Sequence, residues 1–180
     1  MRRLMLLRHA KTENDAPSGR DQDRRLDDRG RRDAAEIGGW MAAHPPFPDE
    51  VKVSPAVRSQ QTWDLAWEAM RGAVPAPRIA FVPELYAADA TALLQVIHGA
   101  VESDPRQLLL VGHNPGMHEA AFLLAGHGNT AGRAALADNL PTSGLVVLDF
   151  DVERWDDVSF RSGGLELFVS PKLLKAASGG

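Results

Sequence analysis

The 180-residue sequence contains no cysteine, and this absence excludes several kinds of chemistry at once. Without a thiol there is no disulfide, no thiolate nucleophile and no zinc site built on sulfur. The chain also lacks a basic surplus, since 20 Lys and Arg stand against 24 Asp and Glu, for a formal net charge of −4. A general nucleic-acid binder shows the opposite balance, so we expect no nucleic-acid partner.

Long apolar runs are absent as well. No stretch approaches the roughly 20 apolar residues that a membrane-spanning helix needs. The N-terminal run Leu4–Leu7 is interrupted by Arg8, His9 and Lys11, which leaves it too short for the hydrophobic region of a signal peptide. We therefore expect a cytoplasmic protein that has no membrane partner.

Apolar runs typical of strands alternate with stretches of helical spacing, which favours an α/β sheet covered on both faces. We predict a three-layer α/β/α sandwich with a mostly parallel sheet. A single domain is expected over residues 1–175, followed by a disordered tail at 176–180. Strands are predicted at about 3–8, 50–54, 79–82, 107–112, 144–150 and 164–170, with the last two as antiparallel additions at the edge. Helices are predicted at about 30–41, 55–70, 91–102 and 117–124, and loops at 13–29 and 126–138.

Two arginines and two histidines occupy equivalent places in this predicted topology, at the carboxyl end of a strand or just after it. They are Arg8 and His9 after the first strand, Arg58 after the second, and His113 after the strand at 107–112. Ligands of open α/β sheets gather at this edge. Taken alone, each is more often a solvated or loop-capping residue. Together they fit a dianionic phosphoryl group, because guanidinium groups orient its oxygens and an imidazole can attack phosphorus.

The segment Leu6–Thr12 resembles the Arg-His-Gly signature of the histidine phosphatase (phosphoglycerate mutase-like) superfamily. Alanine rather than glycine follows the histidine, as in the SixA-type phosphohistidine phosphatase branch. Further segments resemble that branch in the same order along the chain, at 25–30, 54–62, 84–86, 111–116, 140–142 and 170–172. The resemblance therefore spans nearly the whole sequence.

The resemblance implies that His9 is the nucleophile and forms a phosphohistidine intermediate. It implies that Arg8 and Arg58 clamp the phosphoryl oxygens, while His113 donates a hydrogen bond to them as charge builds in the transition state. Thr12 is a further candidate for a phosphate contact.

Glu84 is the candidate general acid, because it falls where larger superfamily members carry an acid. A carboxyl group must be protonated to donate, which requires a raised pKa. The SixA-type branch does not depend on such an acid, so an ordinary exposed glutamate is the alternative reading of Glu84.

These observations predict a metal-independent phosphatase, without a cofactor, that hydrolyses phosphohistidine on a protein. Two alternatives stay open at this point. One is a small-molecule phosphomonoesterase that uses the same site with Glu84 as general acid, and the other is a non-catalytic module that binds phosphate or phosphohistidine. Nothing in the sequence predicts an oligomeric state.

Overall fold

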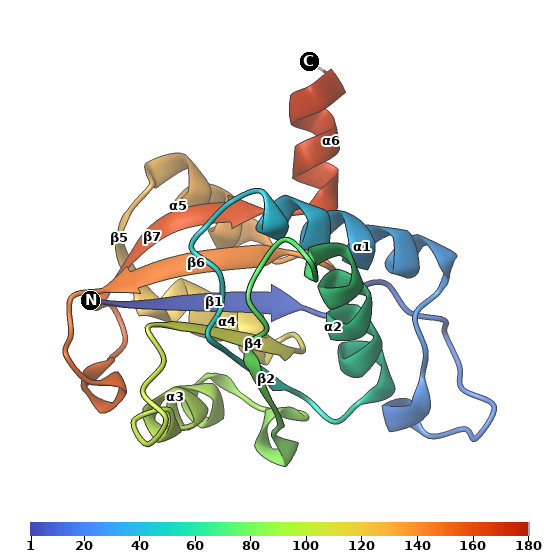
Figure 1. Ribbon diagram of the computed structural model, residues 1–180, viewed down its shortest axis with the longest axis horizontal. Coiled ribbons are helices and arrows are strands. Elements are labelled where there is room, and N and C mark those ends of the chain that lie inside the picture. The colour runs from blue at the N-terminus through green and yellow to red at the C-terminus, as the bar shows by residue number, and fades with distance from the viewer. Residues whose placement is uncertain (180) are drawn as a thin grey trace.

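The computed structural model describes residues 1–179, which form a seven-stranded sheet between helical layers (Figure 1). The strands are β1 (Arg2–Arg8), β2 (Glu50–Val53), β3 (Arg78–Phe81), β4 (Gln107–Gly112), β5 (Ala125–Gly128), β6 (Leu145–Phe150) and β7 (Gly163–Val169). The helices are α1 (Asp28–Ala42), α2 (Val57–Met70), α3 (Ala90–Gly99), α4 (Gly116–Leu124), α5 (Thr130–Asp138) and α6 (Pro171–Gly179). Short 3-10 turns are η1 (Asp21–Asp23), η2 (Pro83–Leu85) and η3 (Trp155–Asp157).

The strand order is β3-β2-β4-β1-β6-β7-β5, and four of the six neighbouring pairs are parallel. The predicted mostly parallel sheet is therefore confirmed. β6 runs antiparallel to both β1 and β7, as expected, but the prediction that β6 and β7 lie at the edge is wrong. β6 lies between β1 and β7, and β7 lies between β6 and β5. The β6 run Leu145–Leu148 is buried throughout, which is the pattern of an interior strand covered on both faces.

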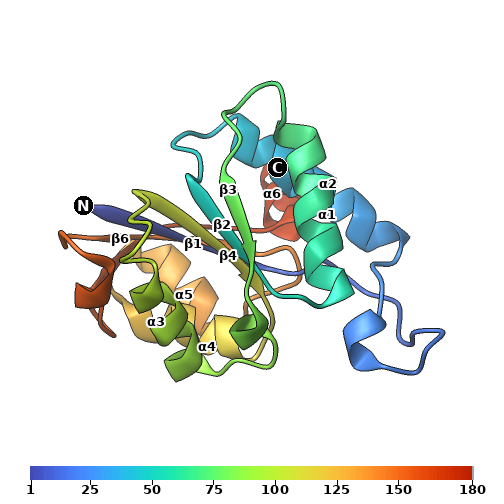
Figure 2. The ribbon, with the colours of Figure 1, turned by 60° about the horizontal axis from the view of Figure 1, so that its bottom comes forward.

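Figure 2 shows helices on both faces of the sheet, which confirms the three-layer arrangement. Alternate residues of the central strands face opposite helical layers. Leu4 and Leu6 of β1 pack in the cluster that includes residues of α3, α4 and α5. Met5 and Leu7 point the other way, into the cluster that contains residues of α1 and α2. This alternation follows from the two-residue period of a strand.

The predicted loop at 126–138 is wrong, since it contains β5 and α5. Its Gly and Ala content suggested a loop, but Ala has the highest helix propensity. Asn129 caps α5 by accepting a hydrogen bond from the Gly132 N–H at 2.6 Å, and Leu136 is buried beneath the helix.

The C-terminal segment also differs from expectation. Residues 176–179 continue α6 where a disordered tail was predicted, and residue 180 lies outside the described residues. The helix stands away from the body in Figure 1, and Lys175 lies 3.8 Å from the buried Asp33 carboxylate of α1.

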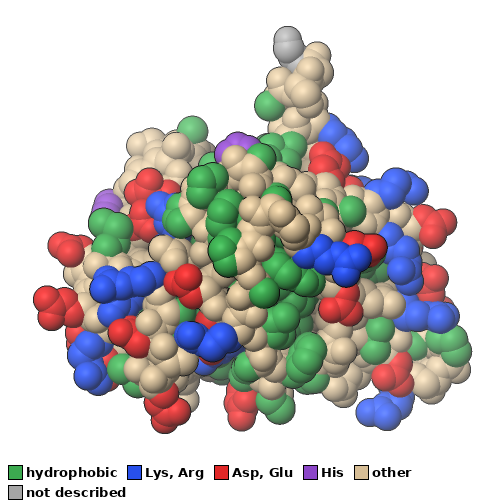
Figure 3. All heavy atoms as spheres, in the orientation of Figure 1, with side chains coloured by type: hydrophobic (Ala, Val, Ile, Leu, Met, Phe, Trp, Pro, Cys, Tyr) green, Lys and Arg blue, Asp and Glu red, His purple; other side chains and the backbone are tan. Residues whose placement is uncertain are grey.

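Hydrophobic side chains gather in the middle of the face shown in Figure 3, while charged side chains lie mainly around its margin. Within residues 1–179, no helix is both long and apolar enough to cross a membrane.

Because β1, β2 and β4 are mutually parallel, their carboxyl ends meet at one edge of the sheet, and the predicted site residues follow those ends.

Candidate active site

Adjacent parallel strands bring the two predicted histidines together. Arg8 pairs with Gly112 in the β1–β4 register, and the His9 N–H donates to the Gly112 carbonyl at 2.9 Å. His113 follows Gly112 directly, so its ring centroid lies 5.3 Å from that of His9. Both imidazoles are buried, with 8% and 7% exposure respectively.

The first turn of α2 places Arg58 beside them. The Thr62 hydroxyl accepts from the Ala10 N–H at 2.9 Å and donates to the Arg58 carbonyl at 2.7 Å. These two hydrogen bonds tie the start of α2 to the loop after β1. Arg58 therefore lies next to the loop that carries His9, with only 6% exposure.

The His9 ring has the protonation pattern that a nucleophile needs. Its Nδ1 lies 2.8 Å from the Ala10 carbonyl, which can only accept, so Nδ1 carries the proton and Nε2 keeps a free lone pair. Burial lowers the pKa of His9 to about 3, and the nearby charges of His113, Arg58 and Arg8 act in the same direction. His9 is therefore neutral at neutral pH.

His113 offers a hydrogen-bonding nitrogen to the same part of the site as His9. Its Nε2 lies 2.7 Å from the Ser54 hydroxyl oxygen, which accepts from the Ala56 N–H at 3.3 Å. In the tautomer in which the Ser54 hydroxyl donates to Nε2, the proton of the neutral ring lies on Nδ1, which has no protein partner. Burial, assisted by the Arg58 charge, lowers the pKa of His113 to about 4.

The buried polar atoms that lack a partner gather at this strand edge. Within residues 1–179 they are Arg8 Nε, Arg58 Nε, His113 Nδ1 and Ser143 Oγ. The Ser143 N–H itself lies 3.2 Å from the Arg8 and His9 carbonyls. Leaving a buried donor unpaired costs about 1–3 kcal/mol, so unpaired buried donors call for an explanation. The Nε–H groups of Arg8 and Arg58, together with His113 Nδ1 in its protonated tautomer, fit an anion with several acceptor oxygens, such as a phosphoryl group.

An open hollow of about 410 Å³ lies beside these groups and is lined by residues that include Arg58, Tyr86, His113, Asn114 and Glu119. Sequence reasoning missed Tyr86, although it belongs to the 84–86 segment that carries the resemblance and is the one tyrosine in the chain. Its ring meets the His113 ring edge-on at a centroid distance of 5.6 Å. Tyr86 therefore forms one wall of the site.

Glu84 and Thr12, two further predicted site residues, contact groups other than the four clustered residues. Glu84 is exposed on η2 and lines a separate hollow with Lys52 and Gln95. The Thr12 hydroxyl accepts from Arg24 Nη1 at 2.6 Å. The structure thus brings together Arg8, His9, Arg58 and His113, but neither Glu84 nor Thr12 joins the unpaired donors. Residues 1–179 contain no group of three or more His, Asp or Glu side chains placed to hold a metal ion.

The low pKa values of the two histidines predict a pH-dependent stability. Between about pH 6.5 and pH 4 the unfolded chain binds protons at His9 and His113 that the folded protein does not. The two histidines therefore leave the free energy of unfolding unaffected above pH 6.5 and lower it as the pH falls, by up to about 1.4 kcal/mol per pH unit for each histidine. Urea unfolding between pH 7 and pH 4.5 measures this slope.

The variant His113→Asn is expected to flatten that slope, whereas His127→Asn, at an exposed position, is expected to keep it. Equal slopes in the wild type and in His113→Asn would contradict the assignment.

Comparison with known proteins places this geometry in context. Residues 4–80 match the model of the histidine phosphatase superfamily (branch 1). An uncharacterized protein of Mycobacterium leprae is 31% identical over 172 residues, a match that covers 92% of this chain and 100% of the relative.

Two solved structures are similar over almost their whole length. A candidate phosphohistidine phosphatase SixA from Nakamurella multipartitia has a TM-score of 0.80 and 26% identity, covering 94% of this chain and 96% of that one. A candidate phosphohistidine phosphatase SixA from Agrobacterium tumefaciens has a TM-score of 0.74 and 32% identity, covering 94% and 99%. The similarity therefore extends over the entire fold and is not confined to one motif.

Proposed function

The chain belongs to the histidine phosphatase superfamily, and we propose that it hydrolyses phosphohistidine on a protein substrate through a phosphorylated His9. The observation that carries this proposal is the buried, neutral His9 ring beside His113, at the strand edge where Arg8 Nε, Arg58 Nε and His113 Nδ1 are buried without a partner. The names of the two similar SixA structures support the choice of phosphohistidine as the substrate.

In the first step His9 Nε2 attacks phosphorus, and the P–N bond of the substrate breaks as the new P–N bond forms. A substrate imidazole that is protonated on its other nitrogen leaves as a neutral ring, so this step needs no proton from the enzyme. Arg8, Arg58 and the His113 Nδ1–H stabilise the equatorial oxygens as negative charge develops there.

In the second step a water oxygen attacks the phosphorus of phosphorylated His9, and the Nε2–P bond breaks. The electron pair returns to Nε2, and inorganic phosphate and the proton of the water are released to solvent. Because the Ala10 carbonyl keeps a proton on Nδ1, the phosphorylated ring is positively charged and leaves as neutral imidazole. The hydrogen bond that prepares the nucleophile therefore also makes it a good leaving group.

The position of Glu84 favours a phosphoramidate over an ester. An alkoxide leaving group needs a proton donor, and the exposed Glu84 lies on a different hollow from His113. We expect kcat/KM to be higher on a phosphohistidine protein than on phosphoglycerate or an aryl phosphate, with Glu84→Gln changing every value by less than about twofold. A preference for the small esters, or a large loss on them in Glu84→Gln, would favour the phosphomonoesterase instead.

We further propose that the reaction is independent of metal ions, because Arg8, Arg58 and His113 supply positive charge and hydrogen-bond donors around the phosphoryl group. Turnover of a phosphohistidine protein is expected to stay unchanged after dialysis against a strong chelator. Loss of activity that one divalent ion restores would contradict this part of the proposal.

A further inference from the structure

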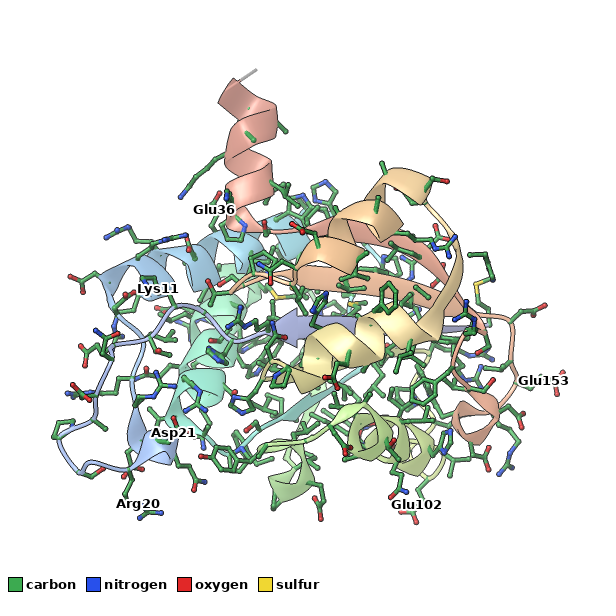
Figure 4. The ribbon with its side chains drawn as sticks, turned by 180° about the vertical axis from the view of Figure 1, so that it is seen from behind. Lys11, Arg20, Asp21, Glu36, Glu102 and Glu153 are labelled. Carbon is green, nitrogen blue, oxygen red and sulfur yellow. The ribbon has the colours of Figure 1, made fainter. Side chains whose placement is uncertain are left out.

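Asp21, in the polar segment between β1 and α1, reaches across to the candidate active site. Figure 4 shows its side chain on the loop beyond the carboxyl end of β1. Its carboxylate accepts from Arg58 Nη2 at 3.0 Å, from the Tyr86 hydroxyl at 2.7 Å and from Arg24 Nε at 3.0 Å. Its backbone carbonyl accepts from Arg58 Nη1 at 2.8 Å.

We propose that Asp21 is a positioning residue, which holds the Arg58 guanidinium so that its Nε edge faces the phosphoryl group. This inference rests on the proposed function, in which Arg58 binds that group.

The division of hydrogen bonds around Arg58 carries the argument. A guanidinium has five N–H donors in a rigid plane, and a bidentate partner uses one edge of that plane at a time. Asp21 occupies the end formed by Nη1 and Nη2, whereas Nε is buried and unpaired. The adjacent edge, which contains Nε, therefore remains for a second bidentate acceptor.

The charge of Asp21 suits this role. The hydrogen bond from Tyr86 is the main factor that lowers the pKa of Asp21 below its usual range, and the contacts with Arg24 and Arg58 add to it. The carboxylate is therefore ionised at every working pH and provides a counter-charge for Arg58, whose side chain is only 7% exposed. An unpaired guanidinium at this depth would be costly.

Arg24 and Tyr86, which both donate hydrogen bonds to the Asp21 carboxylate, are themselves held by further contacts. Arg24 is itself bound to the Thr12 hydroxyl at 2.6 Å and to the Glu13 carbonyl at 3.2 Å, which fixes the loop beside β1. Tyr86 packs against His113, and its ring centroid lies 5.9 Å from the Arg58 guanidinium carbon. Asp21 is thus held between Arg24 and Tyr86 and orients Arg58 from a fixed position.

A double-mutant cycle on the whole protein tests the inference, with inorganic phosphate as the probe and calorimetry as the readout. Asp21→Ala is expected to weaken phosphate binding roughly tenfold, and Asp21→Asn, which retains an acceptor oxygen, to weaken it less. In the Arg58→Ala background Asp21→Ala is expected to have no further effect, because Asp21 acts through Arg58. Asp23→Ala is the matched control, since this carboxylate on the same turn bonds to the Ser18 hydroxyl and is expected to leave binding unchanged.

An equal loss in both backgrounds, no loss at all, or tighter phosphate binding in Asp21→Ala would overturn the inference. Tighter binding would mean that Asp21 competes with phosphate for Arg58. A wrong assignment of the proposed function would give a different result. If phosphate binding shows the expected coupling but phosphohistidine protein is not turned over, the substrate is wrong, whereas the Asp21–Arg58 relationship is supported.

Discussion

His9→Ala is expected to lower the turnover of phosphohistidine protein by about 10⁴-fold or more. The variant removes a buried, neutral imidazole whose Nε2 keeps a free lone pair, at the strand edge that also carries the unpaired buried atoms of Arg8, Arg58 and His113. The sequence has no cysteine that could replace it as nucleophile. Steady-state rates of phosphate release, measured at neutral pH with enough enzyme to detect slow turnover, check the prediction.

His127→Ala is the control for this experiment, because His127 is exposed and lies outside the hollow beside His113. Its rate is expected to equal that of the wild type. Activity in His9→Ala within tenfold of the wild type would mean that another group attacks phosphorus.

Arg58→Ala is expected to lower kcat/KM by about 10²- to 10³-fold, since it removes a buried donor aimed at developing charge. Arg58→Lys is expected to recover little of this loss. A lysine ammonium is a point charge and cannot bond to Asp21 and the phosphoryl group along two edges of one rigid plane. Rates of both variants on phosphohistidine protein, together with inhibition by inorganic phosphate, provide the measurement.

Arg71→Ala is the matched control, because Arg71 is exposed at the opposite end of the same helix, α2. Full activity of Arg58→Lys would show that the positive charge alone is sufficient. The planar, bidentate geometry of the guanidinium would then have no part in the reaction.

The clustering of four predicted site residues could be foreseen because each lies at or after the carboxyl end of a strand that the sequence pattern indicates. Parallel strands end at a common edge, so the positions of Arg8, His9, Arg58 and His113 along the chain determine their neighbourhood in space. Asp21 could not be predicted in this way. It lies in a polar segment without periodicity, and its contact with Arg58 depends on how the loop folds back over α2.

Two errors in the predicted fold have related physical causes. β6 was assigned to the edge from its late place in the chain, although its continuous apolar run is the pattern of an interior strand. The segment 126–138 was assigned to a loop from its glycines, although the Asn129 cap and the alanines favour the helix that follows. In both segments the local pattern of residues determines the structure, rather than the place in the chain or the overall composition.

Trapping the phosphoryl enzyme tests the central claim most directly. The protein is mixed with a ³²P-labelled phosphohistidine protein, quenched within one turnover, and digested for mapping of the label. We expect the label on Nε2 of His9, labile in acid and stable in base, as a phosphoramidate requires, and absent from His9→Ala. Label on a serine or aspartate, or rapid turnover without any labelled intermediate, would contradict the account.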